Sequence, residues 1–228
     1  MEAHNFKIIG GDTDSIMFCK PDESPFTKEE QRSLIDEINA LLPKMIKYDS
    51  DGIFKRVVYL KAKNYLMVDE KGKWKIKGSA LKSSTPEPAL KDMLKEMLDA
   101  IVYDKGNDEL VNIYHKYVKI VRDGITDIKP WSKKMQLSPT TFNSTRTNET
   151  KIVDALKGTE YKSGDRVYLY TTPDHTLKLV EQYDGQYDKI TYLDKLFKTT
   201  KRFETILPVK EMFLNYSLKR NSSKINDI

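Results

Sequence analysis

Two short apolar runs near the start of the chain, residues 6–9 (FKII) and 16–19 (IMFC), enclose a turn of glycine and aspartate. Short apolar runs favour β-strands, and a Gly/Asp turn between them is typical of a β-hairpin. The chain is therefore predicted to begin with a tight hairpin that carries Asp12 and Asp14 at its tip. Because side chains alternate along a strand, both carboxylates face the same side if Thr13 points to the other side.

The remaining apolar patterns predict further strands and several amphipathic helices. A helical stripe runs from Leu34 to Ile46, with Thr27 and Glu30 as a capping box before it and Pro43 breaking its last turn. Further strands are predicted over 53–60, 64–68, 73–77 and 166–170. Further helices are predicted over 107–121, 149–156, 191–199 and 208–218, and one more opens with Thr85 as its N-cap and Pro86 at its first position.

The segment 125–150 is rich in Ser, Thr, Asn and Pro, and this composition indicates a linker or an irregular crossing. We therefore expect an α+β chain with an N-terminal part over residues 1–125 and a mixed, mainly helical part over 126–228. The single cysteine, Cys19, excludes an internal disulfide framework and a cluster of thiolate metal ligands. The absence of an apolar run of about 18 residues excludes a membrane-spanning helix. A signal peptide is not visible either, so a reducing, cytoplasmic compartment is expected.

The positive charge of the chain is concentrated in one segment. Residues 55–82 contain nine basic and two acidic side chains, a net charge of +7 against +5 for the whole chain. The rest of the chain therefore sums to −2. Localised positive charge next to aromatic side chains is typical of a surface that binds polyanions, although a solvated lysine-rich hairpin has the same composition.

Two carboxylates close together repel each other, and a divalent cation relieves that repulsion. Mg²⁺ prefers carboxylate oxygens, water and phosphates, so the hairpin tip is a candidate magnesium site, with an ordinary Asp-rich turn as the simplest alternative. An EF-hand loop starting at Asp12 needs glycine and an oxygen ligand where the chain has Met17 and Ile16. A glycosyltransferase with a metal-binding DxD and a polymerase palm hairpin both stay open at this point.

Three elements in order resemble family B DNA polymerases. Gly11-Asp12-Thr13-Asp14-Ser15 between two apolar strands is similar to motif C of that family. Lys61-Ala62-Lys63-Asn64-Tyr65 is similar to the family's lysine-x-tyrosine strand, although phage relatives often carry arginine where this chain has Asn64. Lys77 followed by Lys82-Ser83-Ser84-Thr85-Pro86 is similar to the element that follows in phage members. Gly164-Asp165-Arg166-Val167-Tyr168 is more loosely similar to a thumb strand.

The resemblance implies a fold and a set of site residues. The fold is a partial palm, an antiparallel hairpin and sheet with packed helices, followed by a thumb. Asp14 and the accompanying Asp12 are the implied catalytic and metal-binding residues for two Mg²⁺ ions, which are shared with another chain that supplies the motif A aspartate. Gly10, Gly11, Thr13 and Ser15 form the structural turn. The implied DNA-binding residues are Lys61, Lys63, Tyr65, Lys82, Ser83, Ser84, Thr85, Lys133 and Lys134.

Motif A, a fingers helix and an exonuclease domain are not found in the sequence. The resemblance therefore implies the C-terminal subunit or fragment of a DNA-directed DNA polymerase that is inactive without an N-terminal partner, and Met1 just before the hairpin favours a natural split-polymerase subunit. The other implied partners are primer-template DNA and an incoming dNTP. The alternatives are a non-catalytic fragment that binds duplex DNA and, with less support, the DxD glycosyltransferase.

Overall fold

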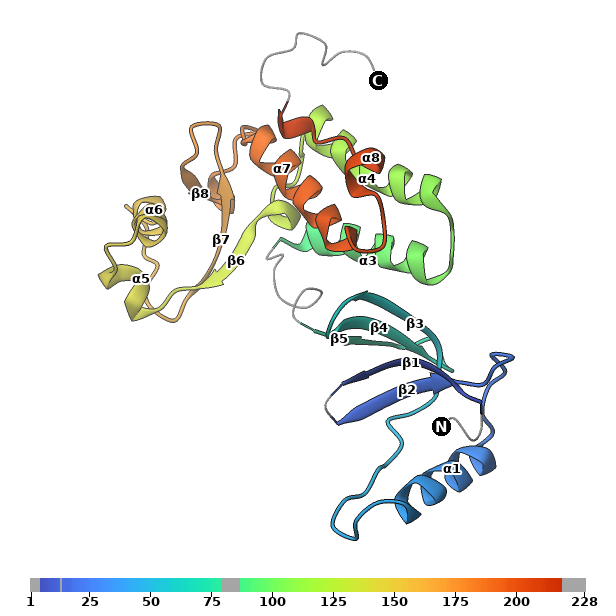
Figure 1. Cartoon of the computed structure of the whole chain (residues 1–228). Helices are drawn as coiled ribbons and strands as arrows, with labels where there is room; N and C mark the ends of the chain where they lie inside the picture. The colour runs from blue at the N-terminus through green and yellow to red at the C-terminus, as the bar shows by residue number, and fades with distance from the viewer. Residues whose placement is uncertain (1–4, 13, 79–86, 219–228) are drawn as a thin grey trace. The chain divides into compact units, whose positions relative to one another are not determined.

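The computed structural model describes residues 5–12, 14–78 and 87–218 (Figure 1). The chain divides into two compact units, Met1–Lys82 and Ser83–Ile228. Both units combine helices with small antiparallel sheets, as the α+β prediction expects. Among the described residues, no helix has both the length and the apolar character that crossing a membrane requires.

The described residues of the first unit form a two-stranded ribbon, a three-stranded sheet and one helix (Figure 1). The strands and the helix are β1 (Lys7–Asp12), β2 (Ser15–Cys19), α1 (Lys28–Ala40), β3 (Phe54–Lys61), β4 (Asn64–Asp69) and β5 (Trp74–Lys77). All neighbouring strands are antiparallel, in the order β1-β2 and β3-β4-β5. The predicted hairpin and the three predicted strands after it are therefore confirmed. Leu60 of β3 and Leu66, Met67 and Val68 of β4 are buried and form the core of this unit.

Helix α1 begins as predicted but ends earlier. The Thr27 hydroxyl accepts a hydrogen bond from the Glu30 N–H at 3.1 Å, and the Glu30 carboxylate accepts one from the Thr27 N–H at 2.8 Å. The helix ends at Ala40 instead of continuing to Ile46. Pro43 explains the early end, because proline lacks an N–H and disfavours helical geometry in the residue before it.

The second unit is built on three helices that pack against one another, α3 (Pro88–Val102), α4 (Asn107–Asp123) and α7 (Lys189–Thr200). A sheet in the order β6-β7-β8 accompanies them, formed by β6 (Lys133–Gln136), β7 (Arg166–Thr171) and β8 (Leu177–Leu179). The short elements are η2 (Lys129–Trp131), α5 (Pro139–Asn143), α6 (Thr147–Ala155), η3 (Val180–Gln182), η4 (Lys201–Phe203), α8 (Val209–Met212) and η5 (Tyr216–Leu218). The predicted helix 208–218 is thus two separate short helices.

The segment 125–150 is not a linker. Ile125, Ile128, Trp131 and Leu137 are all buried, and the segment contains a strand and two short helices. The Trp131 ring packs edge-on against Tyr117 and Tyr192, with centroid distances of 6.3 and 6.0 Å. The polar composition suggested an exposed connection, but a few well-spaced apolar side chains are enough to anchor this segment in the core.

The compact units meet at 82/83, whereas the sequence placed the boundary at 125/126. The reason is that α3 and α4 pack with α7 and therefore belong with the C-terminal elements. Helix α3 also begins at Pro88 with Glu87 at its N-cap position. The predicted helix start at Thr85 and Pro86 stays a prediction. Thr85 and Pro86 themselves lie outside the described residues.

Gly78 fixes the end of β5 against the turn between β3 and β4. Its φ of +93° lies in the left-handed region, and a Cβ there would overlap the backbone oxygen of Lys63 and the side-chain amide of Asn64. We expect Gly78→Ala to lower the free energy of unfolding of this sheet by about 2–3 kcal/mol, from the strained backbone and the overlap together.

The measurement is hydrogen–deuterium exchange of the backbone amides of β3 to β5. Gly72→Ala is the matched control, because Gly72 also has a positive φ of +78° but no atom lies within 4 Å of its added Cβ. Gly72→Ala should lower the free energy of unfolding by only about 1 kcal/mol. Equal effects of the two variants would contradict the close approach at Gly78.

Glu87 and Lys195 connect the start of α3 to α7. The Glu87 side chain is only 3% exposed, and its carboxylate accepts a hydrogen bond from the Lys195 ammonium at 2.7 Å, where the lysine side chain is 32% exposed. We expect Lys195→Met to destabilise the second unit by about 3 kcal/mol, because a buried carboxylate loses its partner.

Urea denaturation followed by circular dichroism measures this effect. Lys198→Met on the same helix is the control, since Lys198 pairs with Asp194 at a more exposed position, with side chains 66% and 32% exposed. Lys198→Met should lower the free energy of unfolding by only about 0.5 kcal/mol. A similar loss in both variants would show that helix propensity or net charge, and not the buried pair, determines the result.

Candidate functional site

The tip of the β1–β2 hairpin presents the two predicted acids. Asp12 and Ser15 are paired across the two strands, so Thr13 and Asp14 alone form the connection. Asp12 and Asp14 are both exposed, with the Asp12 side chain 39% accessible. Thr13 lies outside the described residues, so the predicted orientation of its side chain stays a prediction.

The base of the hairpin packs against β3 through one tyrosine. The strand register shifts between Ile8 and Gly10, and a Cβ on Gly10 would overlap the phenol of Tyr59. The Tyr59 hydroxyl donates a hydrogen bond to the sulfur of Met17 at 3.8 Å, and Met17 is the cross-strand partner of Gly10. The group that occupies the space beside Gly10 is therefore Tyr59.

Tyr59 also connects the hairpin to the lysine-x-tyrosine element. Its ring lies 5.1 Å from the ring of Tyr65, which is its cross-strand partner in β4. Burial, and secondarily the neighbouring Tyr65, raises the pKa of Tyr59, so its hydroxyl keeps its proton and stays a donor. Sequence reasoning missed Tyr59, because one aromatic residue in an apolar strand looks like any other core residue.

Lys63 lies in the turn between β3 and β4, which is the gap between the strands predicted over 53–60 and 64–68. The resemblance to a lysine-x-tyrosine strand had suggested a strand position for it. Its φ of +60° is in the left-handed region. From this turn its ammonium reaches the Asp12 carboxylate, with 3.4 Å between Nζ and Oδ1. The Lys63 side chain is 74% exposed, so this ion pair contributes under about 1 kcal/mol to stability. The structure therefore brings together two motif elements that are far apart in the sequence.

The other residues of the lysine-x-tyrosine element have different surroundings. Lys61 is exposed at the end of β3, and Tyr65 is partly buried in β4. Asn64 is only 7% exposed, and its side-chain amide donates to the Ala62 carbonyl at 2.9 Å. Asn64 therefore stabilises the turn. Lys82, Ser83, Ser84 and Thr85 lie outside the described residues.

Asp12 and Asp14 are the two carboxylates that the sequence predicted to hold a metal ion. Within residues 5–12, 14–78 and 87–218, no group of three or more His, Cys, Asp or Glu side chains could hold a metal ion. Carboxylate oxygens suit Mg²⁺, so Asp12 and Asp14 fit such an ion in part. The Lys63 ammonium beside Asp12 supports this, because it shows that the tip attracts positive charge.

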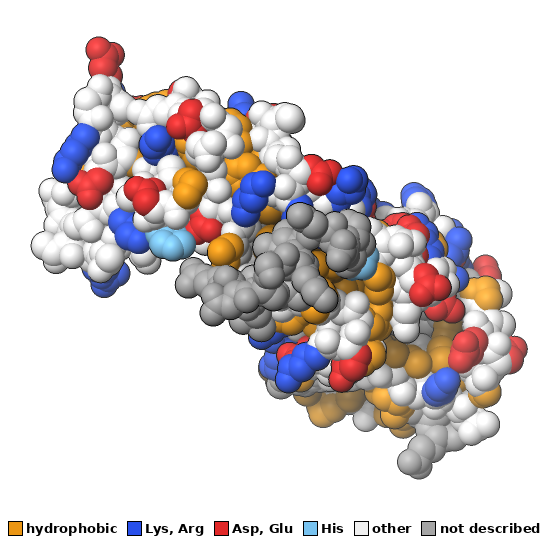
Figure 2. Space-filling model, turned by 90° about the horizontal axis from the view of Figure 1, so that it is seen from above, with side chains coloured by type: hydrophobic (Ala, Val, Ile, Leu, Met, Phe, Trp, Pro, Cys, Tyr) orange, Lys and Arg blue, Asp and Glu red, His pale blue; other side chains and the backbone are white. Residues whose placement is uncertain are grey.

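Lys133 and Lys134 are adjacent in β6 and therefore point to opposite faces of the sheet. Lys133 is paired with Leu169, which belongs to the hydrophobic core, whereas Lys134 is paired with Tyr168. Both lysines are exposed. Figure 2 shows that basic and acidic side chains alternate over the visible face of the molecule, so net charge alone does not locate a binding surface.

Comparison with known proteins identifies a family. The family model described as DNA polymerase family B matches residues 1–208. The DNA polymerase of Archaeoglobus fulgidus is 25% identical over 123 residues, which is 54% of this chain and 15% of that protein. The DNA polymerase of Paramecium bursaria Chlorella virus NY2A is 30% identical over 128 residues, which is 51% of this chain and 14% of that protein.

The fold agrees with this assignment. The structure of the family B DNA polymerase from Pyrobaculum calidifontis superimposes with a TM-score of 0.68 at 17% identity, covering 92% of this chain and 28% of that chain. This chain thus spans only a small part of the length of the proteins it matches. Because the family model covers most of its residues, the chain belongs to DNA polymerase family B.

Proposed function

We propose that the chain is the C-terminal palm-and-thumb part of a DNA-directed DNA polymerase and that Asp14, accompanied by Asp12, contributes one side of its catalytic metal site. The observation that carries this proposal is the contact between Lys63 and Asp12. It supports the proposal because it joins the hairpin tip, expected to be motif C, to the element expected to follow the primer. Membership of family B supports the polymerase activity and sets aside the glycosyltransferase alternative.

In this proposal the carboxylates of the hairpin hold Mg²⁺ beside the primer end. When bound, two such ions lower the pKa of the 3′-hydroxyl and neutralise the triphosphate of the incoming dNTP. The chain's own contribution is a short ribbon that holds Asp14 exposed on a two-residue connection. The contact of Gly10 with Tyr59 supports this role, because it anchors the hairpin below its tip.

The DNA contacts in this proposal come from both units. Lys61, Lys63 and Tyr65 contact the primer strand, and residues 82–85 contact a phosphate. Lys133 and Lys134 belong to the thumb, residues 126–228, which contacts the backbone of the duplex. Contacts to phosphates and to the minor groove carry little sequence information, so they suit an enzyme that copies any template.

A second polymerase segment completes the site. The described residues lack a third metal-binding side chain near Asp12 and Asp14, and this supports a partner that carries motif A, the fingers and the exonuclease. Whether that segment belongs to a separate subunit or to a longer chain, we expect the chain alone to be inactive and to function in the cytoplasm. The phage-like element at residues 82–86 supports a split phage-type polymerase.

One observation favours a second candidate function, a duplex-binding fragment without catalysis. The Lys63 ammonium already neutralises part of the charge on Asp12, as a permanent counter-ion in a non-catalytic protein does. The two candidates differ in their response to metal ions. A polymerase requires Mg²⁺ at Asp14, whereas a duplex-binding fragment binds DNA equally well without it.

We expect Asp14→Asn to abolish most primer extension. The chain is co-expressed with the polymerase segment that carries motif A, and Mg²⁺-dependent extension is measured on a primed template. Extension by the variant should fall by about 10²–10³-fold, because charge stabilisation of the transition state is lost. Asp36→Asn, an exposed aspartate on α1, is the matched control and should retain full activity.

Two results would contradict the proposal. Primer extension by the isolated chain would show that its metal site is complete without a partner. Unchanged extension by the Asp14→Asn assembly would show that the hairpin is not catalytic, and would favour the duplex-binding candidate.

We expect Lys63→Gln to weaken duplex binding by the isolated chain. Loss of one phosphate contact lowers the slope of log affinity against log salt by about 1. Fluorescence anisotropy of a labelled primer-template over a series of NaCl concentrations measures that slope. Lys71→Gln in the β4–β5 turn removes the same charge from an exposed position and serves as the control. An equal change in both variants would mean that net charge alone governs binding.

A further inference from the structure

Strand β8 forms one edge of the sheet β6-β7-β8, and part of its main chain faces away from the sheet. Within the described residues, β8 pairs with β7 alone. The Thr172 N–H donates to the Thr176 carbonyl at 3.0 Å, and bonded positions alternate with unbonded ones in an antiparallel pair. Lys178, which is paired with Tyr170, is therefore bonded to β7, whereas the N–H and carbonyl of Leu177 point to the outer edge.

The neighbouring residue on the same edge supports this direction. The Leu179 N–H donates to the side-chain oxygen of Gln182 at 3.4 Å, so the main chain at every second residue of β8 points outward. Among the described residues, the N–H and carbonyl of Leu177 have no hydrogen-bond partner. Unpaired groups on a sheet edge are a template for a further strand. Leu177 therefore offers one donor and one acceptor to an extended chain.

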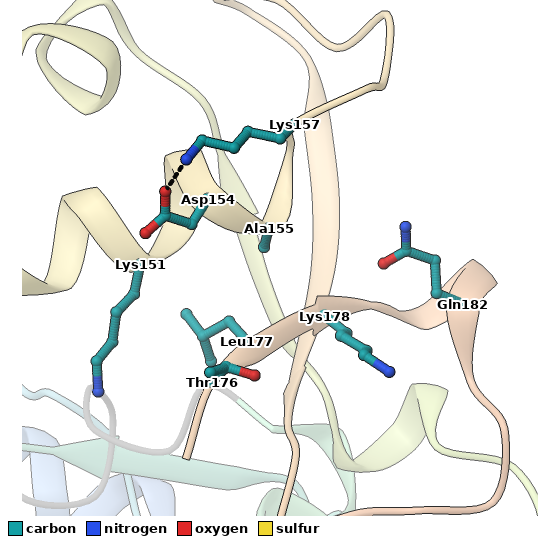
Figure 3. A pocket seen from close by; sticks show the side chains of 8 residues that line it. All are labelled: Lys151, Asp154, Ala155, Lys157, Thr176, Leu177, Lys178 and Gln182. Carbon is teal, nitrogen blue, oxygen red and sulfur yellow. Dashed lines mark ion pairs between the residues drawn. The ribbon is translucent and has the colours of Figure 1, made fainter. Parts of the chain in front are cut away.

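This edge opens into a hollow of about 280 Å³ between α6 and β8 (Figure 3). Ala155 and Leu177, which are partly buried against the neighbouring hydrophobic core, line it with apolar surface. Four charged side chains also line the hollow: Lys151, Asp154, Lys157 and Lys178. Three lysines and one aspartate sum to a net charge of +2, so the lining favours a ligand that is both apolar and acidic.

The three lysines can exchange their present partners for the carboxylates of a ligand. Lys157 pairs with Asp154 at 2.7 Å, but the two side chains are 75% and 63% exposed. Lys178 lies 3.6 Å from the Asp184 carboxylate, and that pair is also exposed. Lys151 donates to a main-chain carbonyl of the β7–β8 turn at 3.3 Å. Exposed pairs of this kind contribute little to stability, so their exchange costs the protein little.

The lysines are spread along the strand edge. Figure 3 shows Lys151 at one end of the hollow and Lys178 with Gln182 at the other, with Leu177 between them. The ammonium groups do not point to one spot, so a compact anion such as inorganic phosphate cannot contact all of them. A ligand that lies along β8 contacts Lys151, Leu177 and Lys178 in turn. Such a ligand is extended, with an apolar side chain in the middle and acids on both sides.

The edge is held in place by the helix next to it. The Nδ1 atom of His175, in the β7–β8 turn, lies 2.6 Å from Oδ2 of Asp188, whose side chain is only 5% exposed. Asp188 also caps α7, since its carboxylate accepts a hydrogen bond from the Thr191 N–H at 2.9 Å. The turn that leads into β8 is thus fixed to a helix end. A preformed edge loses little conformational freedom on binding, which favours affinity for an added strand.

We propose that the outer edge of β8 binds an extended acidic peptide of a partner protein. The peptide adds a strand through hydrogen bonds to Leu177, and its carboxylates pair with the three lysines of the hollow. A peptide supplies both a donor and an acceptor to Leu177, whereas the backbone of DNA only accepts hydrogen bonds and leaves the Leu177 carbonyl unpaired. The inference concerns recognition of a protein and is independent of the metal site and the duplex contact proposed above.

The test measures binding of a defined peptide to the isolated chain. The probe is fluorescein-labelled Glu-Glu-Glu-Val-Glu-Glu-Glu, and fluorescence anisotropy is read at low salt. We expect saturable binding that Lys157→Gln weakens roughly fivefold, because one ion pair with the peptide is lost. Lys119→Gln is the matched control, since Lys119 pairs with Asp123 on α4 at 2.7 Å, with side chains 76% and 60% exposed. The control should bind the probe like the parent chain.

A second probe tests the added strand. The same peptide methylated on the main-chain nitrogen of its valine keeps every charge but cannot donate to the Leu177 carbonyl. We expect it to bind the parent chain roughly tenfold more weakly, because one main-chain hydrogen bond is lost. This comparison leaves the protein unchanged, so its result does not depend on the folding of a variant.

Several results would overturn the inference. The parent chain could fail to bind the probe, or Lys157→Gln and Lys119→Gln could weaken binding equally, which would show that net charge alone is responsible. Equal binding of the methylated probe, together with its displacement by unlabelled duplex DNA, would show a general anion surface without strand addition. Size-exclusion chromatography that reveals a dimer dissociated by the probe would assign the edge to a second copy of this chain. The proposed function is tested separately, by primer extension with the Asp14→Asn assembly.

Discussion

The acids of the hairpin depend on the contact between the β1–β2 ribbon and the turn and strands of β3 and β4. A two-stranded ribbon in water is marginally stable by itself, so something must hold it. Tyr59 provides that support at the base, where it fills the space left by Gly10 and bonds to Met17. Lys63 provides a weaker, electrostatic contact at the tip. The position of the acids is thus set by packing, while Lys63 forms an exposed ion pair with Asp12 at the tip.

This division of roles has a chemical consequence. An exposed ion pair contributes little to stability, so exchange of Lys63 for another cation costs the protein little. In the proposed function, Lys63 exchanges Asp12 for a DNA phosphate, and a metal ion takes the place of the Lys63 ammonium beside Asp12. The packing contact at Tyr59 is of a different kind, because buried aromatic surface is not exchanged during binding.

Much of the first unit could be predicted because its signals are local. The hairpin follows from a Gly/Asp turn between apolar runs, and the start of α1 follows from the Thr27 and Glu30 capping box. The end of α1 was predicted less well, because the effect of Pro43 reaches back further than the single turn it was expected to disturb. The predicted strands left Lys63 in the connection between them, but its left-handed φ of +60° was not predicted, since lysine gives no sequence signal for it.

The second unit was harder to predict because its organisation depends on contacts between distant residues. A segment rich in Ser, Thr, Asn and Pro was taken as a linker, yet Trp131 within it packs between Tyr117 and Tyr192. The division at 82/83 likewise follows from packing of α3 and α4 against α7 and from the buried pair of Glu87 and Lys195. Glu87 and Lys195 are far apart in the sequence, so neither residue alone predicts that the other is its partner.

The sequence by itself determined the chemistry that is available: carboxylates on a tight turn, and lysines and tyrosines on neighbouring strands. The tertiary structure decided which of these groups meet. It brought Lys63 to Asp12, placed Tyr59 beneath the hairpin, and put Lys133 and Lys134 on opposite faces of one sheet. The physical reason is that residue types and local turns are encoded by near neighbours, whereas proximity across strands and helices is set by the packing of side chains far apart in the chain.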